Sequence, residues 1–374
     1  MSYAFDSFVF LLLFVLSFAI CGAILWSQSL HIDRSARAGD LKAVQAAHTA
    51  PTPRIGGLSV VGPIVLAMLM ITPQPLATEM QLFAVTLLPV FVAGLAEDLG
   101  FRVSPLNRLL AAATASAMMI VFLGVWAPPV MLPGLDLLFG FTPFAIVFTI
   151  AWASGICHAM NLIDGVNGFA GATAVLIALG LGFIAMQAGT PILAGIAFAI
   201  VPAVLGFLIF NWPLGRIFLG DAGAYTLGHV LVWLSILIMA WGAEAAPTGV
   251  ALAFFWPVAD TLLAIYRRMR SGRPVGQPDR LHIHQFVMRA LMMLPRRRLD
   301  KGQANALSAL ILTPFAAMPV GASVLLWDRP AMALLAWAVF AVLFVAAYLA
   351  GIRSLRNGHR RRFAGGPNGE NLTK

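Results

Sequence analysis

Long apolar runs alternate with short polar segments along almost the whole chain. A helix needs about 20 apolar residues to cross the hydrocarbon core of a bilayer. Runs of this kind predict about 11 transmembrane helices, at residues 5–27, 55–73, 80–96, 109–126, 141–160, 168–187, 191–210, 222–241, 247–266, 304–326 and 331–352. The pattern therefore predicts an all-α, polytopic integral membrane protein, with residues 1–352 forming a single transmembrane domain.

The composition agrees with a membrane protein. Of the 374 residues, 60% are hydrophobic and only 10% are charged, whereas a soluble domain carries about 25% charged residues. The net charge of +9 is confined to the predicted loops, so we expect no nucleic-acid partner. Both cysteines lie inside apolar runs, which argues against a disulfide framework. No Walker A, GxSxG or HExxH motif occurs.

The basic residues predict how the chain is oriented in the membrane. Every Lys and Arg except Arg329 lies in the loops 28–54, 97–108, 161–167, 211–221 and 267–303 or in the tail 353–374. Because basic loops stay in the cytoplasm, we expect a periplasmic N-terminus, a cytoplasmic C-terminus and a site built from these loops. The basic cytoplasmic tail is expected to anchor the topology against anionic lipid rather than to bind substrate.

One polar stretch, Asn161 to Gly171, stands where two predicted membrane helices meet. It contains two amides, one carboxylate and glycines at positions 165, 168 and 171. Glycines at this spacing let neighbouring backbones approach closely, and a carboxylate at the membrane boundary stays within reach of water. Taken alone, the stretch fits either a connecting loop or a functional site.

Acidic residues stand at the predicted cytoplasmic ends of other spans. Glu97 and Asp98 end a span, where two negative charges are unfavourable with the helix dipole. Mg²⁺ or the nearby Arg102 and Arg108 could compensate them, and unequal pKa values would let one carboxylate act as a base. Asp221 begins another span between glycines, where it could cap the helix or bind a hard cation such as Mg²⁺.

Basic groups that could hold phosphate occur in two of the same loops. Arg54 follows a Pro-rich entry to a span and is either a topological anchor or an anion ligand. Arg280, His282 and His284 favour phosphate recognition, since no third His or Cys is close enough in sequence for zinc. Asp260 is the one acid inside a predicted span, and we expect it to pair with an Arg or His of the following loop rather than to act directly.

Five short motifs follow one another in the chain: Pro53-Arg54-x-Gly56-Gly57, Glu97-Asp98, Asn161-x-x-Asp164-Gly165-x-Asn167-Gly168, Phe218-Leu219-Gly220-Asp221 and Pro278-Asp279-Arg280-x-His282-Ile283-His284. The set covers roughly residues 50–290 and resembles the polyprenyl-phosphate N-acetylhexosamine-1-phosphate transferases, glycosyltransferase family 4. That superfamily includes the phospho-MurNAc-pentapeptide translocase and the undecaprenyl-phosphate GlcNAc-1-phosphate transferase. The last motif is closest in form to the GlcNAc-1-phosphate branch.

The resemblance implies a reaction as well as a family. HexNAc-1-phosphate would pass from UDP-GlcNAc or a related UDP-HexNAc to undecaprenyl phosphate, giving polyprenyl-diphospho-HexNAc and UMP. It further implies Mg²⁺ as cofactor, with Mn²⁺ as a substitute, and a place in the bacterial inner membrane with the site facing the cytoplasm. The expected partners are the polyprenyl phosphate lipid, the UDP-sugar, the bilayer and a second copy in a homodimer. The reaction would begin the membrane stage of a cell-surface polysaccharide pathway.

The resemblance also implies roles for single residues. Asp221 and Asn161 would hold the metal, and Asp98 or Glu97 would be the catalytic base or face the lipid phosphate. The residues implied in substrate binding are Asp164, Asn167, Arg54, Asn211, Arg280, His282 and His284. The family commonly has Asp where this chain has Glu97 and Asn167. The longer carboxylate moves the reacting oxygen by about one bond length, and an amide cannot act as a base.

Two other classes of protein were weighed against the enzyme. A multi-pass transporter or lipid flippase places its working charges near the membrane midplane on broken helices. Here only Asp260 lies well inside a predicted span, away from its ends, and the other polar clusters share one face. A membrane scaffold would need no such ordered set of motifs. The sequence therefore favours the transferase.

Overall fold

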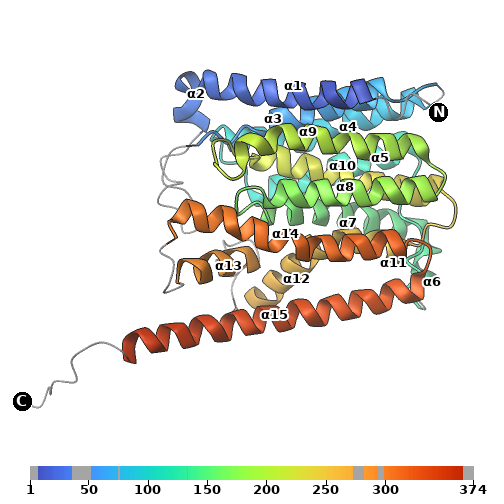
Figure 1. The fold of residues 1–374 in the computed structure, drawn as a ribbon. Helices are drawn as coiled ribbons and strands as arrows, with labels where there is room; N and C mark the ends of the chain where they lie inside the picture. The colour runs from blue at the N-terminus through green and yellow to red at the C-terminus, as the bar shows by residue number, and fades with distance from the viewer. Residues whose placement is uncertain are drawn as a thin grey trace, which may run out of the picture.

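The computed structural model describes residues 7–35, 52–74, 76–132, 134–272, 282–293 and 299–364. These residues form helices and connecting turns, and none of them forms a β-strand. In Figure 1 the long helices run side by side in one bundle, so that α1 begins at one end and α15 finishes at the opposite end. The all-α fold class that the sequence predicts is confirmed.

The bounds of the long helices are α1 (Ser7–Trp26), α3 (Gly57–Met70), α4 (Ala77–Asp98), α5 (Pro105–Leu123), α7 (Thr142–Leu162), α8 (Phe169–Gln187), α9 (Pro191–Asn211), α10 (Gly220–Trp241), α12 (Phe255–Arg270), α14 (Lys301–Leu325) and α15 (Pro330–Ala364). The short helices are α2 (Gln28–Ser35), α6 (Asp136–Phe139), α11 (Pro247–Ala251) and α13 (Ile283–Met292). A 3₁₀ turn, Leu252–Phe254, joins α11 to α12.

Within the described part of the chain, 10 helical segments are long and apolar enough to cross a membrane. They correspond to ten of the predicted spans, and the chain is a polytopic membrane protein as predicted. The remaining predicted span, 55–73, forms α3, which has only 14 residues. Because a proline disfavours helical conformation in the residue before it, Pro73 prevents α3 from continuing. The predicted span 247–266 is built from α11, the 3₁₀ turn and α12 together.

Helix α10 is the central helix of the bundle. Of its most apolar stretch 94% is buried, against 17% for the peripheral α15. Helices α3, α4, α7 and α8 all pack against it. Because α10 is apolar on every side except near its start, its burial is favoured over that of its neighbours. This arrangement places the first turn of α10 in the middle of one end of the bundle.

Glycines bring the neighbouring backbones into contact with that first turn. A Cβ atom on Gly57 would lie 2.4 Å from the backbone nitrogen of Gly223, and one on Gly94 would lie 2.5 Å from that of Ala222. Gly220 has φ of +72°, a conformation that residues with a side chain rarely adopt. No larger residue fits at these positions, so the glycines allow α3 and α4 to reach the start of α10.

Candidate active site

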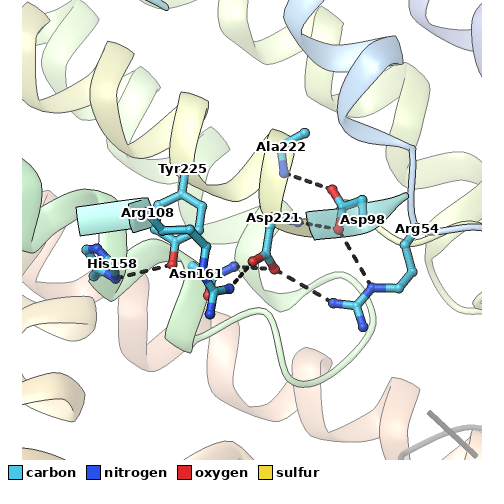
Figure 2. Close-up of polar contacts among 8 residues, drawn as sticks. All are labelled: Arg54, Asp98, Arg108, His158, Asn161, Asp221, Ala222 and Tyr225. Atoms are coloured by element: carbon cyan, nitrogen blue, oxygen red, sulfur yellow. Dashed lines mark hydrogen bonds and ion pairs between the residues drawn. The ribbon is translucent and has the colours of Figure 1, made fainter. Parts of the chain in front are cut away.

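The ends of several helices meet at one end of the bundle and form a charged site. Figure 2 shows Asp221, in the first turn of α10, beside Asp98 from the end of α4. Arg54 comes from the segment before α3, Arg108 from the first turn of α5 and Asn161 from the last turn of α7. Four of the predicted motifs are therefore brought together by the fold, although they are far apart in sequence.

Asp98 caps helix α10. Its Oδ1 accepts a hydrogen bond from the backbone N–H of Asp221 and its Oδ2 accepts one from Ala222, both at 2.9 Å. The carboxylate is fully buried, and it satisfies two N–H groups that have no partner within the helix. The capping role considered for Asp221 thus belongs to Asp98. A catalytic role for Asp98 or for the half-buried Glu97 stays a prediction.

Asp221 is surrounded by groups that complement its charge. Its Oδ2 forms an ion pair with Nη1 of Arg108, and its Oδ1 accepts a hydrogen bond from Nδ2 of Asn161 at 3.0 Å. Nη2 of Arg54 lies 3.7 Å from the same Oδ1, and Nε of Arg54 lies 3.7 Å from Oδ1 of Asp98. The contact with Arg108 is a charge-assisted hydrogen bond, a strong kind, whereas Arg54 acts as an ion pair at longer distance. Two cations and one amide therefore fix the carboxylate of Asp221.

The sequence interpretation missed three residues of this cluster. It treated Arg108 only as compensation for the acidic pair, whereas the guanidinium binds Asp221 and lies 6.0 Å from the centre of the Tyr225 ring. The Tyr225 hydroxyl lies 3.2 Å from Nδ1 of His158 (Figure 2). Spacing offered a clue, since Tyr225 follows Asp221 by four residues and His158 precedes Asn161 by three, so each shares a helix face with a predicted residue.

Asp164 reaches the same site from the loop between α7 and α8. Burial, together with the negative charges of Asp221 and Asp98, raises the pKa of Asp164 to about 8 against the opposing charge of Arg54. The backbone N–H of Gly220 lies near its carboxyl group and acts to lower its pKa. Three carboxyl groups thus converge at the start of α10 beside two arginines, Arg54 and Arg108.

Asn167 and Asn211 lie at this loop, and their side chains contact neighbouring residues of the chain. Both are buried. Oδ1 of Asn211 accepts the N–H of Gly168 at 2.6 Å, and its Nδ2 donates to the carbonyl of Ile217 at 2.8 Å. The side chain of Asn167 lies against Gly215, where a Cβ atom would be 2.4 Å from Nδ2. Asn211 therefore holds two loops together, and substrate contacts by either asparagine stay predictions.

The two histidines form a separate cluster at the base of α13. Nδ1 of His282 lies 2.7 Å from Oδ2 of Asp260, so the expected pairing of Asp260 with the following loop is confirmed. The His284 ring stacks on His282 and lies against Gly165, where no side chain would fit. Burial lowers the pKa of His284 to about 4, so its ring is neutral at pH 7. Arg280 lies outside the described residues.

The donor set at Asp221 suits one kind of metal. Among the described residues there is no group of three or more His, Cys, Asp or Glu side chains that could enclose an ion. Mg²⁺ needs only one or two carboxylates when water and substrate phosphates complete its shell. Asp221 and Asp164 offer such carboxylates, and the side-chain oxygen of Asn161 is left after its Nδ2 binds Asp221. The residues therefore fit a divalent cation that binds together with a phosphate ligand.

The fold and the site define a multi-pass membrane protein that gathers acids, arginines and amides at one end of its helices. The model of glycosyl transferase family 4 matches residues 80–239. The chain is 31% identical over 255 residues to the undecaprenyl-phosphate alpha-N-acetylglucosaminyl 1-phosphate transferase of Yersinia pestis, covering 65% of this chain and 67% of that protein. The chain belongs to this family, as the motifs predict.

Two further relatives agree. The chain is 29% identical over 247 residues to a probable undecaprenyl-phosphate N-acetylglucosaminyl 1-phosphate transferase of Bacillus subtilis, covering 64% of this chain and 67% of that protein. It is 29% identical over 269 residues to a decaprenyl-phosphate N-acetylglucosaminephosphotransferase of Mycobacterium tuberculosis, covering 64% and 66%. The protein is thus a phospho-sugar transferase by class, and these relatives give the transporter and flippase alternatives no support.

Proposed function

We propose that the protein transfers HexNAc-1-phosphate from a UDP-HexNAc donor to a polyprenyl phosphate and releases UMP. The observation that carries the proposal is the position of Asp221 between Arg54, Arg108 and Asn161 at one end of the membrane helices. Relatives in the family are named for transfer of N-acetylglucosamine 1-phosphate to undecaprenyl or decaprenyl phosphate. We infer that undecaprenyl phosphate is the acceptor and UDP-GlcNAc the first donor to test.

The chemistry requires several negative charges to approach one another. A lipid phosphate must attack a diphosphate, and catalysis of such transfers is mainly positioning and charge stabilisation. Arg54 and Arg108 supply two cations in this site. Mg²⁺ held by Asp221, Asp164 and Asn161 would neutralise phosphate oxygens when bound. Asp260 fixes the ring of His282, so that its remaining nitrogen is oriented for a phosphate or sugar contact.

The orientation of the site follows from the same proposal. The site lies at the end of the bundle where α5, α8 and α10 begin and α4, α7 and α9 end, next to the basic loops. Because basic loops stay on the cytoplasmic side, we infer that this end faces the cytoplasm of a bacterial inner membrane, where nucleotide sugars are available. A homodimer stays a prediction.

The nucleotide product tests the proposed function directly. Purified protein with UDP-GlcNAc, undecaprenyl phosphate and Mg²⁺ should release UMP, because transfer of the sugar with its phosphate breaks the diphosphate bond. Separate reactions with UDP-GalNAc and with no lipid serve as the donor comparison and the control. Chromatography of the nucleotides distinguishes UMP from UDP. Release of UDP, or no lipid-dependent UMP from either donor, would contradict the proposal.

The raised pKa of Asp164 predicts how cation binding depends on pH. A carboxyl group whose pKa is about 8 in the folded protein and near 4 when unfolded makes the cation-free protein less stable as pH rises from about 4 to 8. A divalent cation competes with that proton. We therefore expect Mg²⁺ to raise the melting temperature more at about pH 8.5 than at about pH 6.

An Asp164→Asn variant is the matched control for this dependence on pH. The amide has the same shape but binds no proton in this range, so the difference between the two pH values should shrink. Differential scanning fluorimetry with titrated Mg²⁺ measures the shift, and NaCl at equal ionic strength corrects for screening by salt. Equal Mg²⁺ shifts at both pH values in the unchanged protein would refute the role of Asp164.

A further inference from the structure

The start of α14 contacts two of the loops that carry site motifs. This helix begins with a capping box, in which Oδ1 of Asp300 accepts the N–H of Gln303 at 2.8 Å and Oε1 of Gln303 accepts the N–H of Asp300 at 3.2 Å. Its first turn is therefore fixed by its own sequence. The family model ends at residue 239, so α14 lies outside the matched region.

Asn305, in the second turn of α14, binds the turn between α7 and α8. Its Oδ1 accepts the backbone N–H of Asn167 at 2.7 Å. The next backbone N–H, of Gly168, donates to Oδ1 of Asn211 from α9 at 2.6 Å. Two successive backbone N–H groups of this turn thus donate hydrogen bonds to side-chain oxygens of two other helices, α14 and α9. Gly168 has φ of +84°, so the turn does not follow helical geometry here.

The neighbouring residue of α14 holds the second loop. The backbone carbonyl of Ala306 accepts a hydrogen bond from Nε1 of Trp212 at 3.0 Å. The Trp212 ring in turn lies against Gly168, where a Cβ atom would be 2.8 Å from the ring. We call Asn305 and Ala306, with their partners Asn167 and Trp212, the α14 clamp. The clamp ties the two motif-bearing loops to a helix outside the family motifs.

The amide of Asn305 makes this contact although its nitrogen, Nδ2, is left without a hydrogen-bond partner in the described residues. The residue is fully buried. A buried donor without a partner is unfavourable, so an apolar residue of similar size would pack here at less cost. What such a residue could not provide is the oxygen that accepts the N–H of Asn167. The stabilising element of Asn305 is therefore its acceptor atom.

We propose that Asn305 is a positioning residue for the phosphate transfer: its side-chain oxygen fixes the 163–168 turn that places Asp164 at the start of α10. The link is short, because Asp164 lies three residues before Asn167, whose N–H binds Asn305, and the carboxyl group of Asp164 lies near Gly220. Loss of the acceptor would free the turn and displace Asp164 from the convergent carboxylates. The catalytic part of this inference rests on the proposed function, whereas the fixing of the turn does not.

Two substitutions and one control separate positioning from general packing. Asn305→Leu removes the acceptor and keeps the branched outline of the side chain, and Asn305→Asp keeps the acceptor oxygen and replaces only the nitrogen that has no partner. Ser308→Ala is the matched control, since Ser308 is equally buried on α14 but donates only to the carbonyl of Ala304. Hydrogen–deuterium exchange of the peptides that cover residues 161–168 measures the turn without any substrate.

We expect Asn305→Leu to accelerate exchange in the 161–168 peptides and to lower kcat on the order of 100-fold, the effect of misplacing a reacting group by about 1 Å. Asn305→Asp should restore both quantities to within about threefold of the unchanged protein, since its oxygen still accepts the N–H and burial keeps its carboxyl group in the neutral, protonated form. The Ser308→Ala control should leave both unchanged. The melting temperature of each variant corrects kcat for the folded fraction.

Three outcomes would overturn the proposal. The first is unchanged exchange in Asn305→Leu, and the second is a fall in kcat no larger than the loss of folded protein. The third is an Asn305→Asp variant as impaired as Asn305→Leu, which would assign the effect to packing. If the unchanged protein releases no UMP, the proposed function fails, and the exchange experiment still decides whether Asn305 fixes the turn.

Discussion

An Asp221→Asn variant should insert and fold normally yet release UMP about 10³-fold more slowly than the unchanged protein, the order of effect seen when one preorganised electrostatic contact is removed. The amide keeps the size of the side chain but loses its charge. Arg108 and Arg54 would then face a neutral group, and the strongest proposed ligand for Mg²⁺ would be absent. Initial rates of UMP release at saturating substrate measure the effect.

Folding and charge must be separated in this experiment. Size-exclusion chromatography and the melting temperature report on the fold, because Asp221 also accepts the hydrogen bond from Asn161. An Asp328→Asn variant is the control, since Asp328 forms an exposed pair with Arg329 away from the site, with 3.9 Å between Oδ1 and Nε. A rate for Asp221→Asn within tenfold of the unchanged protein would exclude Asp221 as the metal ligand.

Replacing Asp98 by Asn should lower stability as well as activity. Asp98 accepts two backbone N–H groups of α10 with its two oxygens, and an asparagine has only one oxygen to offer. One buried N–H then faces an amide NH₂, which costs about 1–3 kcal/mol, and the favourable charge at the helix start is lost as well. Chemical or thermal unfolding in detergent measures the change, together with UMP release at a temperature where the variant is folded.

Glu97→Gln is the matched comparison, because it changes the adjacent carboxylate without touching the cap of α10. We expect little change in melting temperature for Glu97→Gln. If the melting temperature of Asp98→Asn equals that of the unchanged protein, the capping role is refuted. If Glu97→Gln keeps the full rate, Glu97 is not the catalytic base, which leaves that role to Asp98 or to no carboxylate of the pair.

Some features of the site follow from local sequence. The motif around Asn161, Asp164 and Asn167 lies where two apolar runs meet, and the structure places a turn between α7 and α8 there. The position of Asp260 inside an apolar run predicted that its carboxylate has a partner, and His282 is that partner. Such predictions succeed because a charge within a membrane span must be compensated nearby, whatever the detailed packing.

Other features could not be read from local sequence. Asp98 looked like a candidate base, and only the packing of α4 against α10 shows it as a cap. Arg108 looked like compensation for Glu97 and Asp98, yet it binds Asp221, which lies on a different helix far along the chain. Asn305 lay outside every motif. Each of these roles depends on which helix ends become neighbours, and no local pattern contains that information.

By itself the sequence determined the all-α class, the approximate limits of ten of the eleven predicted membrane spans, and the set of polar motifs between them. Span length and apolar character are local properties, so the bilayer dimension is enough to predict them. Only the tertiary structure decided that α10 is central, that Asp98 caps it, and that Arg54, Arg108 and Asn161 share the carboxylate of Asp221. These depend on close backbone approach at Gly57, Gly94 and Gly220, where the absence of a side chain allows helices distant in sequence to touch.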